Sequence, residues 1–461
     1  MQLAALAGFA LFPFVPLLWI GVGELRRKKR GVTSKHVLTF GDRLLWRTLF
    51  LNLSFLAALL WLKPETSFLA LSTRGDWMVE GLDSPMATLV RDTTDKVTSR
   101  IEWLYVRAEE NPYEKEGGDE PPPPPVPDST GRPVVRRWVV ETPVPDSGVP
   151  TPEPTIAPIP EAPGEAPAWP MSPKLDAIVA QVPASMDADP EAVARWLAQQ
   201  IPNDPFRLAK AIHDVIVDRV AYDFPALAKF PHIPREDAEA LPVWRNRQGV
   251  CSGYTDLFQL MAKAAGLDAA YLVGEIRSES GGVEPIKHAW SAVKIRDAWY
   301  LLDVTWNAGS SENGDNAFHK RYSTSYLFAP PEAFGLDHFP DEPRWQLRGD
   351  PLSRAEFVRQ PLVRPEFLAK GLELLSPVRP QVDTNKQLDI RIRNPRQLSV
   401  LVTAQRKDGR GEQKNCLVVS GTIAVATCTF DSPGAWKVSI FANEQRYESH
   451  PYVAGVDVNN T

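Results

Sequence analysis

Two long apolar runs open the chain and predict a pair of helices. Residues 3–23 carry no charged side chain, and residues 44–62 form a second apolar run that contains Arg47 and Asn52. Each run approaches the ~20 apolar residues with which a helix crosses a bilayer. The pattern predicts a transmembrane helical hairpin that anchors the chain through residues 1–63. The alternative is that residues 44–62 form a buried or interfacial helix.

Charge is divided unevenly between this segment and the rest of the chain. The chain has 51 basic and 57 acidic side chains and a net charge of −6, which argues against a nucleic-acid partner. Residues 1–63 hold nine basic and only two acidic side chains, and seven of the nine basic residues lie in the loop 24–43 between the two apolar runs. By the positive-inside rule this loop faces the cytoplasm. We therefore expect a multi-pass membrane protein whose later domains are extracytoplasmic.

Proline defines the next part of the chain. Residues 64–110 are partly helical by pattern and are interpreted as a juxtamembrane helical segment, whereas residues 111–171 are rich in proline. Proline lacks a backbone donor and favours extended polyproline II, so this stretch is expected to be a semi-rigid linker without a packed core. The alternative is that the run Pro121–Pro125 binds an aromatic groove of a partner.

From residue 172 the pattern becomes that of folded domains. Asp189-Pro190 and Asp204-Pro205 each precede an amphipathic stretch and predict helix starts, because aspartate caps free amides and proline suits the first helical position. Residues 248–267 have apolar side chains at helical spacing. Runs with β-strand character follow at 269–277, 288–295 and 299–306. This order indicates a folded domain over residues 172–378.

The helix predicted at 248–267 carries the most informative chemistry. Cys251 lies at or just before its first turn, where free amides and the helix dipole lower a thiol pKa and can stabilise an oxyanion. His288 opens the middle strand and Asp303 lies within the last strand, so the two can be neighbours across an antiparallel pair. Nucleophilic acyl transfer requires such a thiol, an imidazole that carries the proton and a carboxylate that orients the imidazole.

These segments resemble a known superfamily. GVCSGYTDLFQLMAKAAGL, HAWSAVKI and WYLLDVTW, in this order and at these gaps, look like the Cys-His-Asp core of the transglutaminase-like cysteine peptidase superfamily. The stretch 326–377 is similar to the region after the core in the kyphoscoliosis-peptidase branch. The resemblance implies a papain-like α+β fold and chemistry on amide bonds. It assigns Cys251 as nucleophile, His288 as base and Asp303 as its orienting partner.

The resemblance also points to residues around the reacting groups. Trp290 and Trp306 flank the site in such folds and are expected to line the acyl cleft, unless they are core aromatics. Gln248 and Trp244 are the candidates for a side chain that helps the backbone amide of Cys251 to bind an oxyanion. We see no carboxylate cluster at calcium-loop spacing, so neither a metal nor another cofactor is predicted.

Short alternating runs predict a second folded module at residues 379–461. The expected strands are 388–393, 398–405, 415–421, 423–430 and 435–442. Tight turns join them, which indicates an antiparallel β-sandwich of immunoglobulin-like type. Cys416 and Cys428 lie on strands expected to pair, so a disulfide between them is allowed outside the cytoplasm. The alternative is two free, semi-buried thiols.

Together these patterns predict a membrane-anchored cysteine enzyme that acts on peptide or protein amide bonds through a thioester acyl-enzyme, with hydrolysis as the first expectation. A protein-crosslinking acyltransferase differs from this only in the acceptor. The rival from another class is a non-catalytic adhesion or scaffold protein. A thiol-directed electrophile at mildly acidic pH separates the two classes, because only an activated thiolate reacts well below the ordinary thiol pKa of ~8.5.

Overall fold

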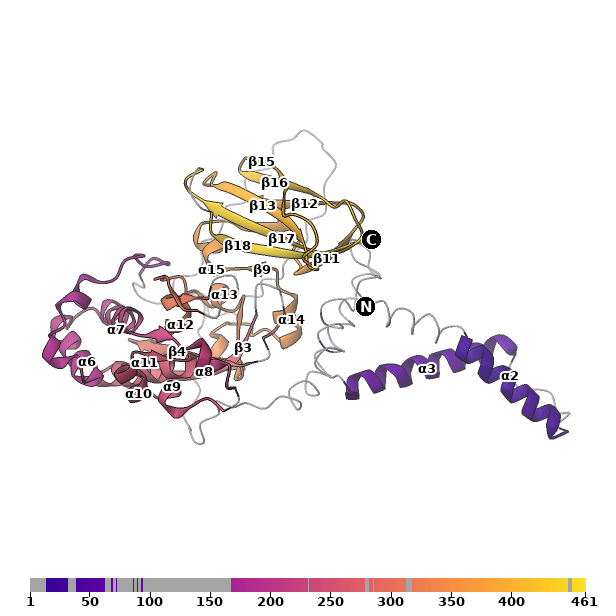
Figure 1. Cartoon of the computed structure of the whole chain (residues 1–461), viewed down its shortest axis with the longest axis horizontal. Helices are drawn as coiled ribbons and strands as arrows, with labels where there is room; N and C mark the ends of the chain where they lie inside the picture. Colours follow the sequence, from indigo (N-terminus) through magenta and orange to yellow (C-terminus); the bar gives the residue numbers. More distant parts are fainter. Residues whose placement is uncertain are drawn as a thin grey trace. The chain divides into compact units, whose positions relative to one another are not determined.

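The computed structural model describes residues 14–31, 39–62, isolated positions between 68 and 93, and 167–461 except 231, 278–281, 285, 312–316 and 447–449. These residues form a helical hairpin near the N-terminus, an α+β core and a C-terminal β-sandwich (Figure 1). Apart from the isolated positions, the predicted juxtamembrane segment 64–110 lies outside this description. So does the predicted linker 111–171, except for its last residues.

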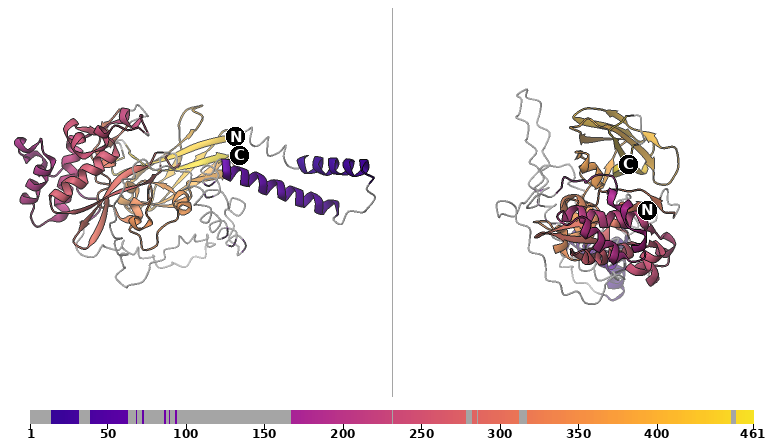
Figure 2. Two further views of the ribbon diagram at one scale, coloured as in Figure 1. Left: turned by 90° about the horizontal axis from the view of Figure 1, so that it is seen from below. Right: turned by 90° about the vertical axis from the view of Figure 1, so that its left-hand side faces the viewer.

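The N-terminal hairpin consists of α2 (Phe14–Lys29) and α3 (Phe40–Leu62), which lie side by side (Figure 2). The ring of Trp19 on α2 meets the edge of Phe50 on α3, with 6.0 Å between the ring centroids. Arg43 Nη1 of α3 lies 2.5 Å from Glu24 Oε1 of α2. Aromatic and ionic contacts therefore join the two helices that the apolar runs predicted.

The predicted membrane spans are not found among these helices. No helix in the described part of the chain is both long enough and apolar enough to cross a membrane. The predicted span 3–23 lies partly outside the described residues, and α2 ends in four basic side chains. The predicted span 44–62 lies within α3, but Arg47 and Asn52 interrupt that helix. Its uninterrupted apolar part is shorter than the ~20 residues that a crossing needs.

The helices of the core begin where their capping residues predict. α6 (Pro190–Gln200) starts after Asp189, whose side chain accepts from two backbone N–H groups, and α7 (Pro205–Arg219) starts after Asp204. Such a cap stabilises a helix by about 1 kcal/mol. α10 (Ala240–Asn246) and α11 (Cys251–Ala264) follow. The apolar sides of these helices pack together in one buried cluster, with Leu197, Ile212, Ile216, Tyr254 and Phe258 among its members.

A four-stranded antiparallel sheet completes the core. Its strand order is β5 (Ala298–Leu302), β4 (His288–Ile295), β3 (Asp268–Ile276) and β8 (His338–Pro340). The helix α11 packs on β3 and β4 and also contacts α6 and α7 (Figure 1). The central helix and the sheet therefore hold the Cys-containing and His-containing segments together, as the α+β prediction requires.

The last predicted strand of the core, 299–306, is only partly correct. The strand β5 ends at Leu302, and α12 (Val304–Ala308) follows at once. Asp303 therefore does not lie within a strand: it is the N-cap of α12, and its side chain accepts from the Trp306 N–H at 3.0 Å. An aspartate that finds a free helical amide favours a cap over a strand interior, which explains the difference.

The C-terminal module is a two-sheet β-sandwich. One sheet has the order β10 (Glu373–Ser376), β12 (Gln387–Arg393), β16 (Ile423–Thr429) and β15 (Leu417–Val419). The other has the order β11 (Gln381–Thr384), β18 (Tyr452–Asn460), β17 (Gly434–Asn443), β13 (Ser399–Arg406) and β14 (Lys414–Asn415), with β9 (Leu362–Val363) also paired to β18. Alternate side chains of both sheets form a second buried cluster. Because β9 and β10 pair with sandwich strands, this module begins before the predicted boundary at residue 379.

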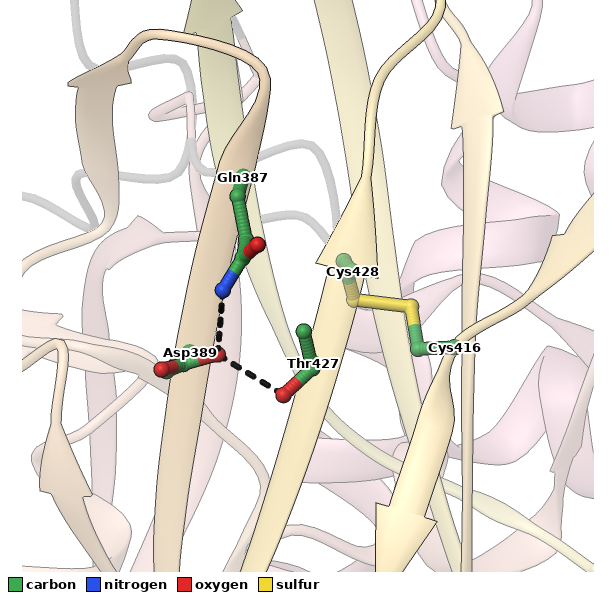
Figure 3. The surroundings of a disulfide bond; sticks show 5 residues. All are labelled: Gln387, Asp389, Cys416, Thr427 and Cys428. Atoms are coloured by element: carbon green, nitrogen blue, oxygen red, sulfur yellow. Dashed lines mark hydrogen bonds between the residues drawn. A yellow bond between two sulfur atoms is a disulfide. The ribbon is translucent and has the colours of Figure 1, made fainter.

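A disulfide joins Cys416 and Cys428 inside the sandwich (Figure 3). Cys428 lies on β16, and Cys416 lies just before β15, the neighbouring strand of the same sheet. Beside the bridge, Thr427 Oγ1 donates to Asp389 Oδ1 of β12 at 2.8 Å. The adjacent strands β12, β15 and β16 are therefore joined by a covalent bond and a side-chain hydrogen bond as well as by their ladders.

Short elements complete the chain between these larger ones. They are η2 (Ala177–Gln181), η3 (Ala184–Met186), β1 (Ala221–Tyr222), α8 (Phe224–Leu227), α9 (Arg235–Ala238), β2 (Gln248–Gly249), β6 (Gly309–Ser310), β7 (His319–Lys320), α13 (Pro331–Phe334), η4 (Pro343–Gln346), α14 (Arg354–Arg359) and α15 (Pro365–Ala369). The end of the predicted proline-rich linker belongs to the core, because Trp169 Nε1 donates to the Ser325 carbonyl oxygen at 3.1 Å.

Candidate active site

Cys251 is the first residue of α11, as the helical spacing after it predicts. The N-cap residue is Val250, which has no side-chain oxygen with which to cap the helix. The thiol therefore lies at the positive end of a helix dipole whose first turn has no side-chain cap, a setting that favours a thiolate. The Cys251 residue is only 2% exposed.

A glycine in the first turn of α11 allows this close packing. A Cβ atom on Gly253 would lie 2.6 Å from Val243 Cγ2 and 2.8 Å from the Asp237 carbonyl oxygen. Real Cβ atoms essentially never approach a neighbour so closely, so α9 and α10 can contact the first turn only because residue 253 has no side chain. Gly253 therefore allows the turn of α11 that carries Cys251 to pack closely against α9 and α10.

His288 and Asp303 meet as predicted, although not across a regular strand pair. His288 opens β4, and its Nε2 lies 2.8 Å from Asp303 Oδ2. Because Nε2 is engaged with the carboxylate, Nδ1 is the ring nitrogen left for the Cys251 thiol, with which His288 is in hydrogen-bond contact. The structure therefore brings the three groups together in the order thiol, imidazole, carboxylate.

The electrostatics of this trio favour an ion pair. Burial acts to raise the pKa of the Cys251 thiol, but His288 and the backbone N–H of Ala289 outweigh it and bring the pKa below its ordinary value. Burial acts to lower the pKa of His288, but Asp303 and Cys251 outweigh it and raise the pKa to about 10. Both shifts favour the pair of thiolate and imidazolium, the reactive form of such a dyad.

A second histidine, His338, completes the surroundings of Asp303 and was missed by the sequence analysis. His338 Nε2 lies 3.1 Å from Asp303 Oδ2, and His338 Nδ1 lies 2.8 Å from Asp337 Oδ1. Burial acts to raise the pKa of Asp303, but His288 and His338 outweigh it and hold the pKa well below its usual range. The only signal in the sequence was the Asp-His pair at 337–338, which has no diagnostic spacing to the other site residues.

Gly274 of β3 allows His338 to lie close to Asp303. A Cβ atom on Gly274 of β3 would lie 2.1 Å from the Phe339 carbonyl oxygen and 2.6 Å from the Trp290 ring. The absence of a side chain at this position lets β8 pair with β3 and brings His338 beside Trp290, with 5.0 Å between ring centroids.

The two predicted tryptophans of the cleft occupy different environments. Trp290 is buried and belongs to a core cluster, with its ring 6.2 Å from that of His288. Its Nε1 has no hydrogen-bond partner among the residues that the structure describes. Trp306 is only partly buried, and its ring centroid lies 5.5 Å from that of His288 and 4.5 Å from that of His338. Trp306 is therefore the better placed of the two to meet an acyl group.

Of the two predicted oxyanion donors, Trp244 is not available. Its indole N–H donates to the Asp187 carbonyl oxygen at 2.9 Å, and its ring packs under Arg247, whose guanidinium carbon lies 4.1 Å from the ring centroid. The tryptophan is therefore a buried structural residue, and an aromatic with one donor cannot serve both partners. Gln248 is exposed at the start of β2 and stays a prediction.

His288, Asp303 and His338 are also the described residues whose ligand atoms are grouped closely enough to hold a metal ion, all within 4.8 Å of one another. The three groups already satisfy one another by the hydrogen bonds described above. The carboxylate oxygen Oδ2 serves both imidazoles, and hydrogen bonding accounts for the arrangement without a cation.

Comparison with known proteins agrees with this picture. Residues 195–304 match the transglutaminase-like superfamily, and residues 354–461 match the KY-like, immunoglobulin-like domain. The chain is 31% identical over 207 residues to the kyphoscoliosis peptidase of Homo sapiens and 30% identical over 207 residues to that of Mus musculus, covering 43% of this chain in each case. These stretches make up 30% of each relative, so the chain spans less than a third of the length of these curated relatives.

Among solved structures, a transglutaminase crystal structure matches with 18% sequence identity and a TM-score of 0.21, over 30% of this chain and 35% of the other. The two matching domains confirm the predicted transglutaminase-like core and its likeness to the kyphoscoliosis-peptidase branch.

Proposed function

We propose, from the transglutaminase-like core and the KY-like domain that this chain combines, that it is a cysteine peptidase acting on peptide or protein amide bonds. The observation that carries the proposal is the contact series from Cys251 through His288 to Asp303, with its 2.8 Å imidazole–carboxylate hydrogen bond. Two relatives that match 43% of this chain are named kyphoscoliosis peptidase, which agrees with the proposal.

In the proposed mechanism the Cys251 thiolate attacks the carbonyl carbon of the amide. The tetrahedral intermediate places its negative oxygen near the first-turn amides of α11, which stabilise developing charge. The His288 imidazolium gives its proton to the leaving amine, and a thioester on Cys251 results. His288 then takes a proton from water as the water attacks the thioester, and collapse of this second intermediate expels the Cys251 thiolate, which releases the acid and restores the thiolate–imidazolium pair. Asp303 keeps the imidazole oriented throughout.

Access to the thiol is part of the proposal, because Cys251 and His288 are 2% and 5% exposed. An acyl donor therefore reaches the sulfur only after a neighbouring side chain moves. Trp306 is partly buried and packs against His288, so we propose that a change of its rotamer opens the site.

The test is capture of the acyl-enzyme. The full chain is incubated with a peptide library and quenched in acid, and the mass added to the Cys251 peptide is measured. We expect a thioester in the parent and none in Cys251→Ala, while Cys251→Ser controls for a residue of similar size. Hydrolysis that continues in Cys251→Ala contradicts the proposal. Product analysis with added primary amine separates hydrolysis from acyl transfer, because only a transferase consumes the amine.

We further propose that the hairpin of α2 and α3 attaches the chain to a membrane, with the folded domains outside the cytoplasm. Support comes from large apolar side chains that the hairpin leaves in contact with solvent, including Leu18, Trp46 and Trp61, which are 66%, 60% and 82% exposed. A hairpin with such a surface needs an apolar environment. The Cys416–Cys428 disulfide is of the kind that persists in oxidising compartments.

Two measurements test this location. The full chain should stay with membranes in high salt, which removes proteins held only by charge, whereas Trp46→Ser combined with Trp61→Ser should release more of it. In cells quenched with acid and a maleimide, Cys416 and Cys428 should be found oxidised. Reduced thiols at both positions would place the sandwich in a reducing compartment and contradict the second half of the proposal.

A further inference from the structure

His338 differs from an ordinary buried histidine in the partners of its two ring nitrogens. Its Nε2 faces Asp303 Oδ2 at 3.1 Å, and its Nδ1 faces Asp337 Oδ1 at 2.8 Å. An ionised carboxylate only accepts hydrogen bonds, so each nitrogen must carry a hydrogen for both contacts to be made. A neutral imidazole has only one such hydrogen. A His338 ring that donates from both nitrogens is therefore an imidazolium.

A second buried histidine, His213, has a carboxylate beside only one of its two ring nitrogens. His213 Nδ1 lies 2.8 Å from Asp214 Oδ1, which matches the pairing of His338 with Asp337. Its other nitrogen, however, lies 3.0 Å from Asn307 Nδ2. The orientation of that amide follows from its other end, because Asn307 Oδ1 accepts from the Tyr326 N–H at 3.1 Å. An amide N–H donates to His213 Nε2, so His213 is neutral with one hydrogen on Nδ1.

Asp337 is held in place to receive the His338 hydrogen. Tyr326 donates its hydroxyl to Asp337 Oδ2 at 2.6 Å, and Arg364 Nη1 donates to the same oxygen at 3.2 Å. The Asp337 carboxylate therefore accepts from both groups on Oδ2, which leaves Oδ1 to accept from His338. Arg364 also joins the core to the sandwich, because its backbone N–H donates to the Val453 carbonyl oxygen at 2.8 Å.

We propose that His338 is a positioning residue, a buried imidazolium bridging Asp337 and Asp303 that holds the Asp303 carboxylate in line with His288. The inference rests on the proposed function, since it assigns a role in orienting the catalytic trio. Asp303 is then satisfied on both oxygens: Oδ1 by the Trp306 N–H and Oδ2 by the two imidazoles. The carboxylate cannot rotate without breaking at least one of these bonds.

The proton count is tested first, on the unaltered full chain. Its 7 histidines are labelled with nitrogen-15, and the signals are assigned by replacing the other histidines one at a time. At neutral pH, His338 should show a hydrogen on both ring nitrogens, and His213 should show one on Nδ1 only. A single hydrogen on His338 would overturn the proposal, and no folding of a His338 variant is required for this result.

The positioning role is tested with His338→Gln, which removes the positive charge while keeping an N–H donor. The charged or titratable groups around residue 338 are Cys251 on α11, Arg277 just after β3, His288 on β4, Asp303 before α12, Tyr326, Asp337 before β8, and Arg364 before α15. Loss of a positive charge lets neighbouring groups keep their protons to higher pH. In a plot of the rate of Cys251 alkylation by iodoacetamide against pH, the acid limb should therefore move to higher pH by on the order of one unit.

A matched control is His213→Gln, which removes a buried histidine with the same carboxylate neighbour geometry but no bond to Asp303. The pH dependence of Cys251 alkylation in His213→Gln should be the same as in the parent. The rate constant kcat/KM of His338→Gln for any peptide found to acylate Cys251 should fall by roughly tenfold to a hundredfold, the effect of weakening one charge-assisted hydrogen bond.

The outcomes separate this inference from the proposed function. If the parent thiol reacts only near the ordinary thiol pKa of ~8.5, the proposed function fails whatever His338→Gln does. If the parent reacts at acidic pH and His338→Gln has the same profile and the same kcat/KM, only the role of His338 is wrong. An equal shift in His213→Gln would also count against it, because the change would then follow from the loss of any buried histidine.

Discussion

Asp303 Oδ2 lies 2.8 Å from His288 Nε2, and this bond joins the first residue of β4 to the residue that follows β5. The two strands are neighbours in the sheet, paired from Ser291 with Leu302 to Ile295 with Ala298. The bond therefore lies just beyond the end of the ladder, where a strand gives way to the cap of α12. A side chain at that point can serve a helix with one oxygen and an imidazole with the other.

The pH dependence of amide hydrolysis should follow from this bond. Activity should fall on the acid side as Cys251 gains its proton, at a pH below the ordinary thiol pKa of ~8.5, and on the alkaline side near pH 10, where His288 loses its proton. The measurement is kcat/KM against pH with a peptide that acylates Cys251. An alkaline limb near pH 7 would contradict the raised pKa of His288.

The same shift predicts how stability changes with pH. The pKa of His288 is higher in the folded chain, about 10, than the ~6.5 of an unfolded histidine. Its ion pair therefore stabilises the fold fully below pH ~6.5, and this contribution fades as the pH rises through the folded value. Urea unfolding of the parent and of His288→Gln should show a difference in free energy that shrinks between pH 7 and pH 11. A constant difference would contradict the prediction.

Gly253→Ala should disturb the candidate site more than its size suggests. The added Cβ would meet Val243 and the Asp237 backbone, so the first turn of α11 must shift. We expect a loss of about 1–3 kcal/mol in the free energy of unfolding, as for other overpacked positions, and slower alkylation of Cys251. The control is Gly349→Ala, whose new Cβ would have no atom of the described residues within 4 Å and which should change stability by less than ~0.5 kcal/mol.

Removing the disulfide should destabilise the sandwich without changing the reactivity of the candidate active site. Removing the bridge with Cys416→Ala and Cys428→Ala, which are 12 residues apart, should cost about 3 kcal/mol of unfolding free energy. The alkylation profile of Cys251 should not change, because that thiol belongs to the core. Thiol titration of the denatured, unreduced parent should find one reactive cysteine and, after reduction, all three. Three thiols before reduction would show that the bridge does not form.

The burial of Cys251 predicts a dependence on reagent size. Iodoacetamide should alkylate the folded chain, whereas a maleimide on a long polymer should react far more slowly, because only a small molecule reaches a thiol that is 2% exposed. Trp306→Ala should reduce the difference by removing the partly buried ring beside His288. Denatured protein is the control, in which both reagents should react. Equal rates on the folded chain would mean that the sulfur is open to solvent.

Local sequence signals were enough to predict most of the larger helices and strands of this protein. The Asp-Pro pairs at 189–190 and 204–205 define the starts of α6 and α7, because a cap depends on residues within a few positions of it. The helix that carries Cys251, the strand that His288 opens and the alternating runs of the sandwich are likewise readable from spacing alone. The resemblance of these segments to the transglutaminase-like superfamily is confirmed over residues 195–304.

Only the tertiary structure decided which of these residues meet. His338 and Asp303 are 35 residues apart, and the absence of a side chain on Gly274 is what lets β8 pair beside β3 and bring them together. Trp244 looked available as a donor because its partner, Asp187, lies 57 residues away in the sequence. Hydrogen bonds between distant residues depend on register and packing, which short-range patterns do not encode, so the second imidazole at Asp303 could be found only in the folded chain.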